Sequence, residues 1–93
     1  MKIIDQEMRK RGYAAGLNGS RYVRAAVEII AAGPQERSIM LTKELYPTIG
    51  KAAGVDWRCV ERSMRYAVKV ARPGRRVRDE LYDLAAVVRA YED

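Results

Sequence analysis

The sequence predicts an all-α fold, a compact bundle of about five helices. Apolar residues recur at spacings of three and four along most of the chain, which is the period of one helix face. Gly, Pro and Ser interrupt this pattern and leave segments of helix length between them. No segment shows the alternation of a half-buried strand. The length of 93 residues favours one domain, residues 1–93, with a small core.

The first half of the chain contains two of these segments. The first helix is expected over about residues 3–11 and ends at Gly12. A turn, GLNGS, follows, and its Gly and Asn residues tolerate positive φ. The second helix is expected over about residues 20–32 and ends at Gly33-Pro34, a strong stop signal. Its buried face should contain Tyr22, Val23, Ala26, Val27 and Ile30.

The third helix is short and contains a proline. A polar loop, QERS (35–38), leads to Thr42, which is expected to cap the helix N-terminus, with Glu44 in the first turn. Pro47 cannot donate a backbone hydrogen bond, so the regular helix either begins there after a looser turn or is kinked there. The helix should end near residue 53. Its inward residues are expected to be Leu45, Ile49, Ala52 and Ala53.

The fourth and fifth helices carry the clearest patterns. Residues 57–72, WRCVERSMRYAVKVAR, place apolar side chains on one stripe and charged side chains on the other, as in an amphipathic helix. The apolar stripe is Trp57, Val60, Met64, Ala67, Val68 and Ala71. Pro73-Gly74 breaks the helix, and residues 78–92 form the fifth, with a buried stripe of Leu81, Leu84, Ala85, Val88 and Tyr91. Asp79, Glu80 and Asp83 are explained by the start of that helix, where acids are favoured.

The positive charge is concentrated in one region. Residues 57–78 contain eight basic residues against the single acid Glu61, a local charge of +7, while the whole chain carries +6. The remainder therefore has a net charge of −1. Such a localised field favours a polyanionic partner, either nucleic acid or an anionic membrane surface.

Several classes of function are disfavoured by what the sequence lacks. With Cys59 as the single cysteine there is no internal disulfide, and with no histidine the commonest general base and zinc ligand are missing. We therefore expect no enzyme, no metal, no cofactor and no small-molecule substrate. No apolar run approaches the roughly 18 residues of a membrane span. The expected location is the cytoplasm.

Residues 43–72 have the spacing of a helix-turn-helix. A short helix is followed by Gly54, which can take a left-handed turn, then by Val55, Asp56 and a second helix. Gly50 leaves room for the second helix to approach. In such motifs the exposed side of the second helix enters the major groove.

The charged stripe of this second helix suits DNA. Arg58, Glu61, Arg62 and Arg65 lie near its N-terminus, where arginine can read guanine and glutamate can accept from cytosine. Lys69, Arg72, Arg75 and Arg76 lie farther along and are expected to contact phosphates. Tyr46 and Tyr66 remain open between packing and phosphate contact, and Trp57 is assigned to the core rather than to base stacking.

The segment KELYPTIGKAAGVDWRCVERSMRYAVKVA resembles the signature of a known family, the C-terminal effector domains of stage zero sporulation protein A, a response regulator of endospore formation. The pattern is roughly K-x-L-Y-P-x-I-A followed by V-E-R-x-x-R-H-A-I-E-V-A. Upstream, GLNGSRYVRAAVEII is similar to another helix of that family, so the resemblance covers about residues 8–71.

The resemblance implies an all-helical DNA-binding domain that regulates transcription, with double-stranded DNA as partner and a homodimer on DNA left open. Carried over by position, Glu61 and Arg62 would contact bases, and Arg65 a base or phosphate. Tyr66 stands where the family usually has His, and Cys59 where it often has Arg. The connection RPGRRV replaces an additional helix and long loop.

Two other interpretations remain open. The basic stripe could be a solvated helix face with pairs such as Glu61 and Arg65 four residues apart. Alternatively, the chain could be a small interaction module that binds another regulator through apolar surface without reading bases. A membrane surface is disfavoured because the helix at 57–72 has Ala and Val rather than bulky apolar side chains for insertion.

Overall fold

The computed structural model describes residues 2–34 and 40–92. Within these ranges the chain forms five α-helices and one π-helical turn, without strands. The elements are α1 (Ile3–Lys10), α2 (Asn18–Ala32), η1 (Leu41–Leu45), α3 (Tyr46–Ala53), α4 (Trp57–Ala71) and α5 (Val77–Glu92). The predicted all-α bundle of about five helices is thus confirmed. The polar loop predicted at 35–38 lies outside the described residues.

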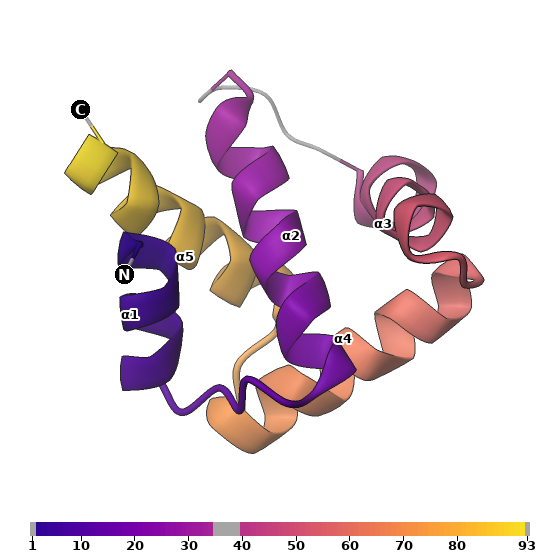
Figure 1. Ribbon diagram of the computed structural model, residues 1–93, viewed down its shortest axis with the longest axis horizontal. Helices are drawn as coiled ribbons and strands as arrows, with labels where there is room; N and C mark the ends of the chain where they lie inside the picture. The colour runs from indigo at the N-terminus through magenta and orange to yellow at the C-terminus, as the bar shows by residue number, and fades with distance from the viewer. Residues whose placement is uncertain (1, 35–39, 93) are drawn as a thin grey trace.

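Helix α2 lies at the centre of the arrangement (Figure 1) and contacts α3, α4 and α5. Helix α1 packs on α5 at one side, and α3 lies at the opposite side. Helix α4 runs along the lower edge of the view, from α3 toward the lower end of α1. The shared core is built from the buried apolar faces of these helices: Ile4, Met8, Val23, Ala26, Val27, Ile30, Leu45, Tyr46, Ile49, Val60, Met64, Ala67, Val68, Leu81, Leu84, Ala85 and Val88.

The start of α2 explains why it can pack so closely on α4. The helix begins at Asn18, two residues before the predicted Ser20, so Gly19 is helical rather than part of the turn. A Cβ on Gly19 would lie 2.0 Å from the carbonyl oxygen of Ser63, so only glycine allows this approach. The Gly and Asn residues of GLNGS, which tolerate positive φ, do not adopt it. Positive φ occurs instead at Gly12, Gly54 and Gly74.

The third helix begins differently from the prediction. Thr42 does not cap α3, because it lies inside η1, a looser π-helical turn that precedes α3. In η1 the Leu45 amide donates to the Met40 carbonyl at 3.2 Å. Helix α3 then starts at Tyr46, with Pro47 in its first turn, where a missing N–H has no intrahelical partner to lose. Of the two alternatives for this proline, the looser turn is the one observed.

Three predicted core residues are instead exposed. Ala52 and Ala53 lie in the last turn of α3, and Tyr91 in the last turn of α5 is 70% exposed. Both helices extend past the core that their earlier turns cover, so helical periodicity alone overestimated the buried stripe. Tyr22 of α2 is only partly buried against the core.

The connection between α3 and α4 is tight and specific. Gly54 adopts φ 74° and ψ 29°, the left-handed conformation expected for it, and the Val55 amide donates to the Gly50 carbonyl at 2.9 Å. A Cβ on Gly50 would lie 2.7 Å from the Val55 carbonyl oxygen, so its predicted role in letting the next helix approach is confirmed. Asp56 then caps α4 by accepting a hydrogen bond from the Arg58 amide at 2.8 Å.

Candidate nucleic-acid interface

Helix α4 has two sharply different faces. Val60, Met64, Ala67 and Val68 are at most 2% exposed and pack against α2 and α3. On the opposite face the side chains of Arg58, Arg62, Arg65 and Lys69 are all exposed, as the charge pattern predicted. The face is fixed to the protein by its buried half and by the neighbouring helices, so the cations project from a rigid support rather than from a loop.

The N-terminal part of this face contains two local interactions. The Arg58 guanidinium lies 5.3 Å from the centre of the Trp57 ring, within the range of a cation–π contact. Trp57 itself is partly buried against the core, as predicted. One turn later, Arg65 Nη2 donates to Glu61 Oε1 at 2.8 Å. This pair is exposed and worth little to stability, but it orients both side chains on the same face.

The two tyrosines that the sequence left open have different surroundings. Tyr46 is 4% exposed and belongs to the core; burial raises the pKa of its phenol, and the nearby Glu61 charge raises it further. Tyr66 is 59% exposed and lies with Arg62 beside a shallow groove of about 360 Å³ that also touches the first residues of α2. Tyr66 therefore joins the exposed face, whereas Tyr46 is structural.

The basic residues that follow Lys69 divide into two groups. Arg76 is exposed. Arg72 is partly buried and Arg75 is exposed, and both side chains contact Glu80 of α5: Arg75 Nε lies 3.3 Å from Glu80 Oε2, and Arg72 Nη1 lies 3.9 Å from Glu80 Oε1. Both were predicted to contact phosphates, and the structure places them against a carboxylate of the same chain.

Glu80 is the functional-site neighbour that sequence reasoning missed. Its side chain is 0% exposed, and it also accepts hydrogen bonds from Arg11 Nη1 and the Tyr13 hydroxyl, each at 3.1 Å. The sequence explained Glu80 by its position in the first turn of a helix, and this does not account for its burial. A signal was present, because Glu80 stands four residues before Leu84 and so falls on the apolar stripe of α5.

The pKa values of two donors around Glu80, Arg11 and Tyr13, are raised in this environment. Burial disfavours the charge of Arg11, but hydrogen bonds to Glu7, Glu80 and Asp83 outweigh it and raise the guanidinium pKa above its ordinary value. Burial raises the pKa of the Tyr13 phenol, and the Glu80 charge raises it further. The cluster is thus held as arginine cations and a neutral phenol around one carboxylate.

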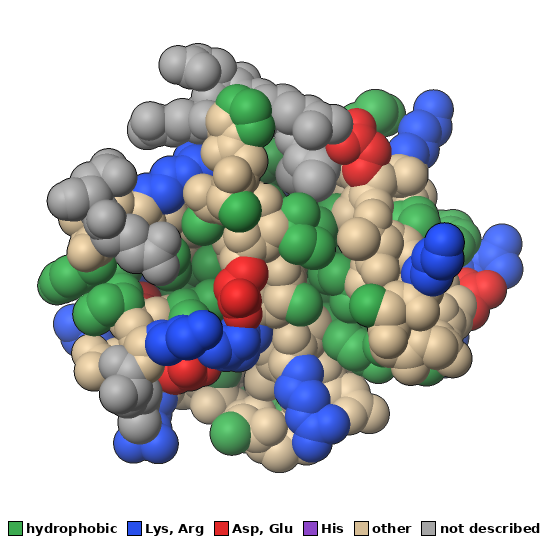
Figure 2. Space-filling view, turned by 45° about the horizontal axis from the view of Figure 1, so that its top comes forward, with side chains coloured by type: hydrophobic (Ala, Val, Ile, Leu, Met, Phe, Trp, Pro, Cys, Tyr) green, Lys and Arg blue, Asp and Glu red, His purple; other side chains and the backbone are tan. Residues whose placement is uncertain are grey.

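One face of the described part of the chain carries scattered basic side chains (Figure 2). On the face drawn in Figure 2, the coloured Lys and Arg side chains lie at separate places, with Asp, Glu and apolar side chains between them.

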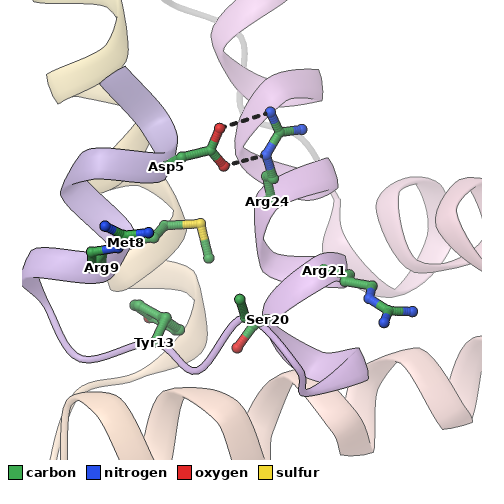
Figure 3. Close-up of a pocket in the computed structure, with 8 residues that line it drawn as sticks. Asp5, Met8, Arg9, Tyr13, Ser20, Arg21 and Arg24 are labelled. Carbon is green, nitrogen blue, oxygen red and sulfur yellow. Dashed lines mark hydrogen bonds and ion pairs between the residues drawn. The ribbon is translucent and has the colours of Figure 1, made fainter. Parts of the chain in front are cut away.

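A cavity of about 320 Å³ lies between α1 and α2 (Figure 3), but its one carboxylate, Asp5, is bound by Arg24 at 2.6 and 3.3 Å. The Arg24 hydrogen bond lowers the Asp5 pKa.

Within residues 2–34 and 40–92, no group of three His, Cys, Asp or Glu side chains is arranged to hold a metal ion. In the described part of the chain, none of the helices combines the length and apolar character that crossing a bilayer requires.

Comparison with known proteins gives one family. A family model described as sporulation initiation factor Spo0A C terminal matches residues 4–90. No curated protein and no solved structure matches the chain.

Proposed function

Since the chain belongs to the family of sporulation initiation factor Spo0A C-terminal domains, which are DNA-binding effector domains, we propose that it is a sequence-specific transcription regulator that reads DNA with α4. In this proposal α3 and α4 act as a helix-turn-helix, and α4 enters the major groove. The observation that carries it is the row of exposed Arg58, Arg62, Arg65 and Lys69 opposite the buried stripe of α4.

The N-terminal half of α4 is proposed to contact bases. A guanidinium can donate two hydrogen bonds to N7 and O6 of guanine, which suits Arg58, Arg62 and Arg65. Glu61 accepts from Arg65 in the free protein and can accept instead from a cytosine amino group. Because each carboxylate oxygen has two acceptor positions, Glu61 can also keep Arg65 oriented while it contacts a base.

The rest of the interface is proposed to contact the backbone. Lys69 and Arg76 are exposed beyond the base-reading turn and supply charge to phosphates. The exposed Tyr66 ring, next to Arg62, is suited to the sugar-phosphate edge of the groove. These contacts set the register of α4 on the duplex, whereas the arginines before them read the sequence.

The test separates base readout from phosphate contact. Binding of the wild type, Arg62→Ala and Lys69→Ala is measured with a duplex selected from a random pool and with a scrambled duplex of equal length. Arg62→Ala should lose about 1 to 3 kcal/mol of discrimination between the two duplexes. Lys69→Ala should weaken binding to both duplexes alike and flatten the salt dependence, because it removes a phosphate contact.

Two outcomes would contradict this assignment. If both substitutions reduce binding to the two duplexes by the same factor, α4 contributes charge without reading bases. If the wild type shows no salt-dependent binding to any duplex, the DNA-binding proposal for this chain fails altogether.

A further inference from the structure

Glu80 of α5 gathers side chains from three other parts of the fold. All of them lie within 3.9 Å of its carboxylate: Arg11 at the end of α1, Tyr13 in the following loop, and Arg72 and Arg75 in the connection from α4 to α5. Asp83 adds a second carboxylate, 2.9 Å from Arg11 and 3.7 Å from Arg75. Three guanidinium groups thus share two carboxylates next to the C-terminal end of α4, the proposed reading helix.

Burial makes Glu80 a strong partner for these arginines. Its side chain is fully buried, so water does not compete for its oxygens, and a buried carboxylate without its cations would be costly. The side chains of Arg72 and Arg75 are 35% and 37% exposed, less than the 66% of the Arg65 side chain on the reading face. Moving either arginine to a phosphate would therefore uncover part of a buried negative charge.

The backbone around the two arginines is also fixed. Arg72 terminates α4, with its amide donating to the Val68 carbonyl at 2.7 Å, and the Arg75 amide donates to the Arg72 carbonyl at 3.1 Å. The chain then enters α5, on whose first turn Glu80 lies. This closed turn brings both guanidinium groups to the same carboxylate. Their neighbours Lys69 and Arg76 are exposed.

We propose that Glu80 is a specificity-determining positioning residue for DNA binding: it holds Arg72 and Arg75 on the protein and so withholds them from the phosphate backbone. The inference rests on the proposed function. Phosphate contacts raise affinity for every duplex equally, whereas base contacts discriminate. The Glu80 carboxylate takes the place that a DNA phosphate would otherwise take beside Arg72 and Arg75. It therefore limits non-specific affinity and leaves a larger share of the binding free energy to the base-reading arginines.

The first experiment compares two substitutions of equal charge. The salt dependence of binding to a scrambled duplex is measured for the wild type, Lys69→Gln and Arg75→Gln. Loss of one phosphate contact lowers the slope of log K against log salt by about 0.9. Lys69→Gln should show that decrease, and Arg75→Gln should keep the wild-type slope. An equal decrease in Arg75→Gln would overturn the inference.

The second experiment releases the arginines. Glu80→Gln keeps the shape of the side chain and removes its charge, and Asp79→Asn is the control because it makes the same change in net charge at an exposed neighbouring position. With Arg72 and Arg75 available, Glu80→Gln should bind the scrambled duplex more tightly and discriminate less. Between 50 and 200 mM salt its affinity should fall about tenfold more than that of the wild type, the effect of two added contacts. Asp79→Asn should follow the wild type.

The outcomes separate the inference from the function on which it rests. A folded Glu80→Gln with an unchanged or shallower slope would contradict the inference while DNA binding by the wild type stands. A purely structural role for Glu80 would lower stability and all binding without steepening the slope. If circular dichroism shows Glu80→Gln unfolded, the comparison of Lys69→Gln with Arg75→Gln decides. Absence of salt-dependent binding by the wild type would contradict the proposed function itself.

Discussion

Polar side chains that connect the ends of different helices are the part of this structure that the sequence predicted least well. Arg89 of α5 donates hydrogen bonds to the carbonyls of Ile30, Ala31 and Gly33 at 2.6, 3.3 and 3.1 Å, which satisfies the C-terminus of α2. Its partners lie 56 to 59 residues away in sequence. No local pattern connects them, so neither this contact nor the arginines around Glu80 could be predicted before the fold was known.

Arg89→Met should lower the free energy of unfolding by about 2 kcal/mol, because partly buried carbonyls lose a charged donor. Arg89→Lys should recover only part of this loss, since an ammonium cannot match the planar fork of a guanidinium. Urea denaturation measures both, with exposed Lys51→Met as the control, expected within about 0.5 kcal/mol of the wild type. Equal stability of Arg89→Met and Lys51→Met would contradict the capping role.

The raised pKa of Tyr13 leads us to expect that the folded protein loses stability at alkaline pH. Its pKa is raised in the folded state by burial and by Glu80, so above the ordinary tyrosine pKa of about 10 the unfolded chain loses a proton that the folded chain keeps. Stability contributed by the protonated phenol is therefore complete below pH 10 and falls as the pH rises above it. Tyr13→Phe should be less stable at pH 7, by about 1 kcal/mol for the lost hydrogen bond, yet decline less steeply above pH 10.

The control for this comparison is Tyr91→Phe, because Tyr91 is 70% exposed. Denaturation at several pH values between 8 and about 11.5 should give wild-type slopes for this variant, the upper limit lying beyond the ordinary tyrosine pKa. If Tyr13→Phe and the wild type lost stability in parallel across that range, the buried phenol would not be the titrating group.

At the scale of elements, periodicity predicted the boundaries of the helices well and the contacts between helices poorly. Helix α4 was expected at residues 57–72 and is observed at Trp57–Ala71, and α5 begins one residue earlier than expected, at Val77. These boundaries follow from Gly, Pro and the apolar period, which are local signals. Gly19 shows what local signals omit: it was interpreted as a turn residue, and its actual constraint is the backbone of α4 lying against it.

Gly19→Ala tests how closely α2 and α4 must pack. The new methyl group would lie 2.0 Å from the Ser63 carbonyl oxygen and 2.8 Å from the Ala67 Cβ, so α4 must shift or the helices must separate. We expect a loss of about 1 to 3 kcal/mol in stability, typical of overpacking, together with weaker binding to DNA. Gly16→Ala is the matched control, because nothing lies within 4 Å of its Cβ position and its φ is not positive.

Thermal unfolding of the two glycine variants and the wild type gives the readout. Gly16→Ala should be neutral or slightly stabilising, since alanine restricts the unfolded chain. Destabilisation of both variants to the same extent would indicate a shared effect on the loop rather than a close approach of α2 to α4.

At the scale of the whole molecule, the bundle presents a basic face on α4 and pairs two of the arginines that follow it, Arg72 and Arg75, with Glu80. Net charge located this region from the sequence, because charge is counted without knowledge of the fold. It did not distinguish Lys69 and Arg76 from Arg72 and Arg75, since that distinction depends on a carboxylate buried on another helix. The exposed face of α4 was predictable, whereas the pairing of Arg72 and Arg75 with Glu80 was not.

The most direct test of base reading by α4 is interference by methylation of guanine N7, which projects into the major groove. A selected duplex is methylated sparsely, bound to protein, and the bound and free fractions are compared guanine by guanine. The wild type should be blocked by methylation of particular guanines, and Arg62→Ala should lose that interference at one of them while retaining it at the others. Interference that is absent from the wild type, or identical in Arg62→Ala, would contradict the account.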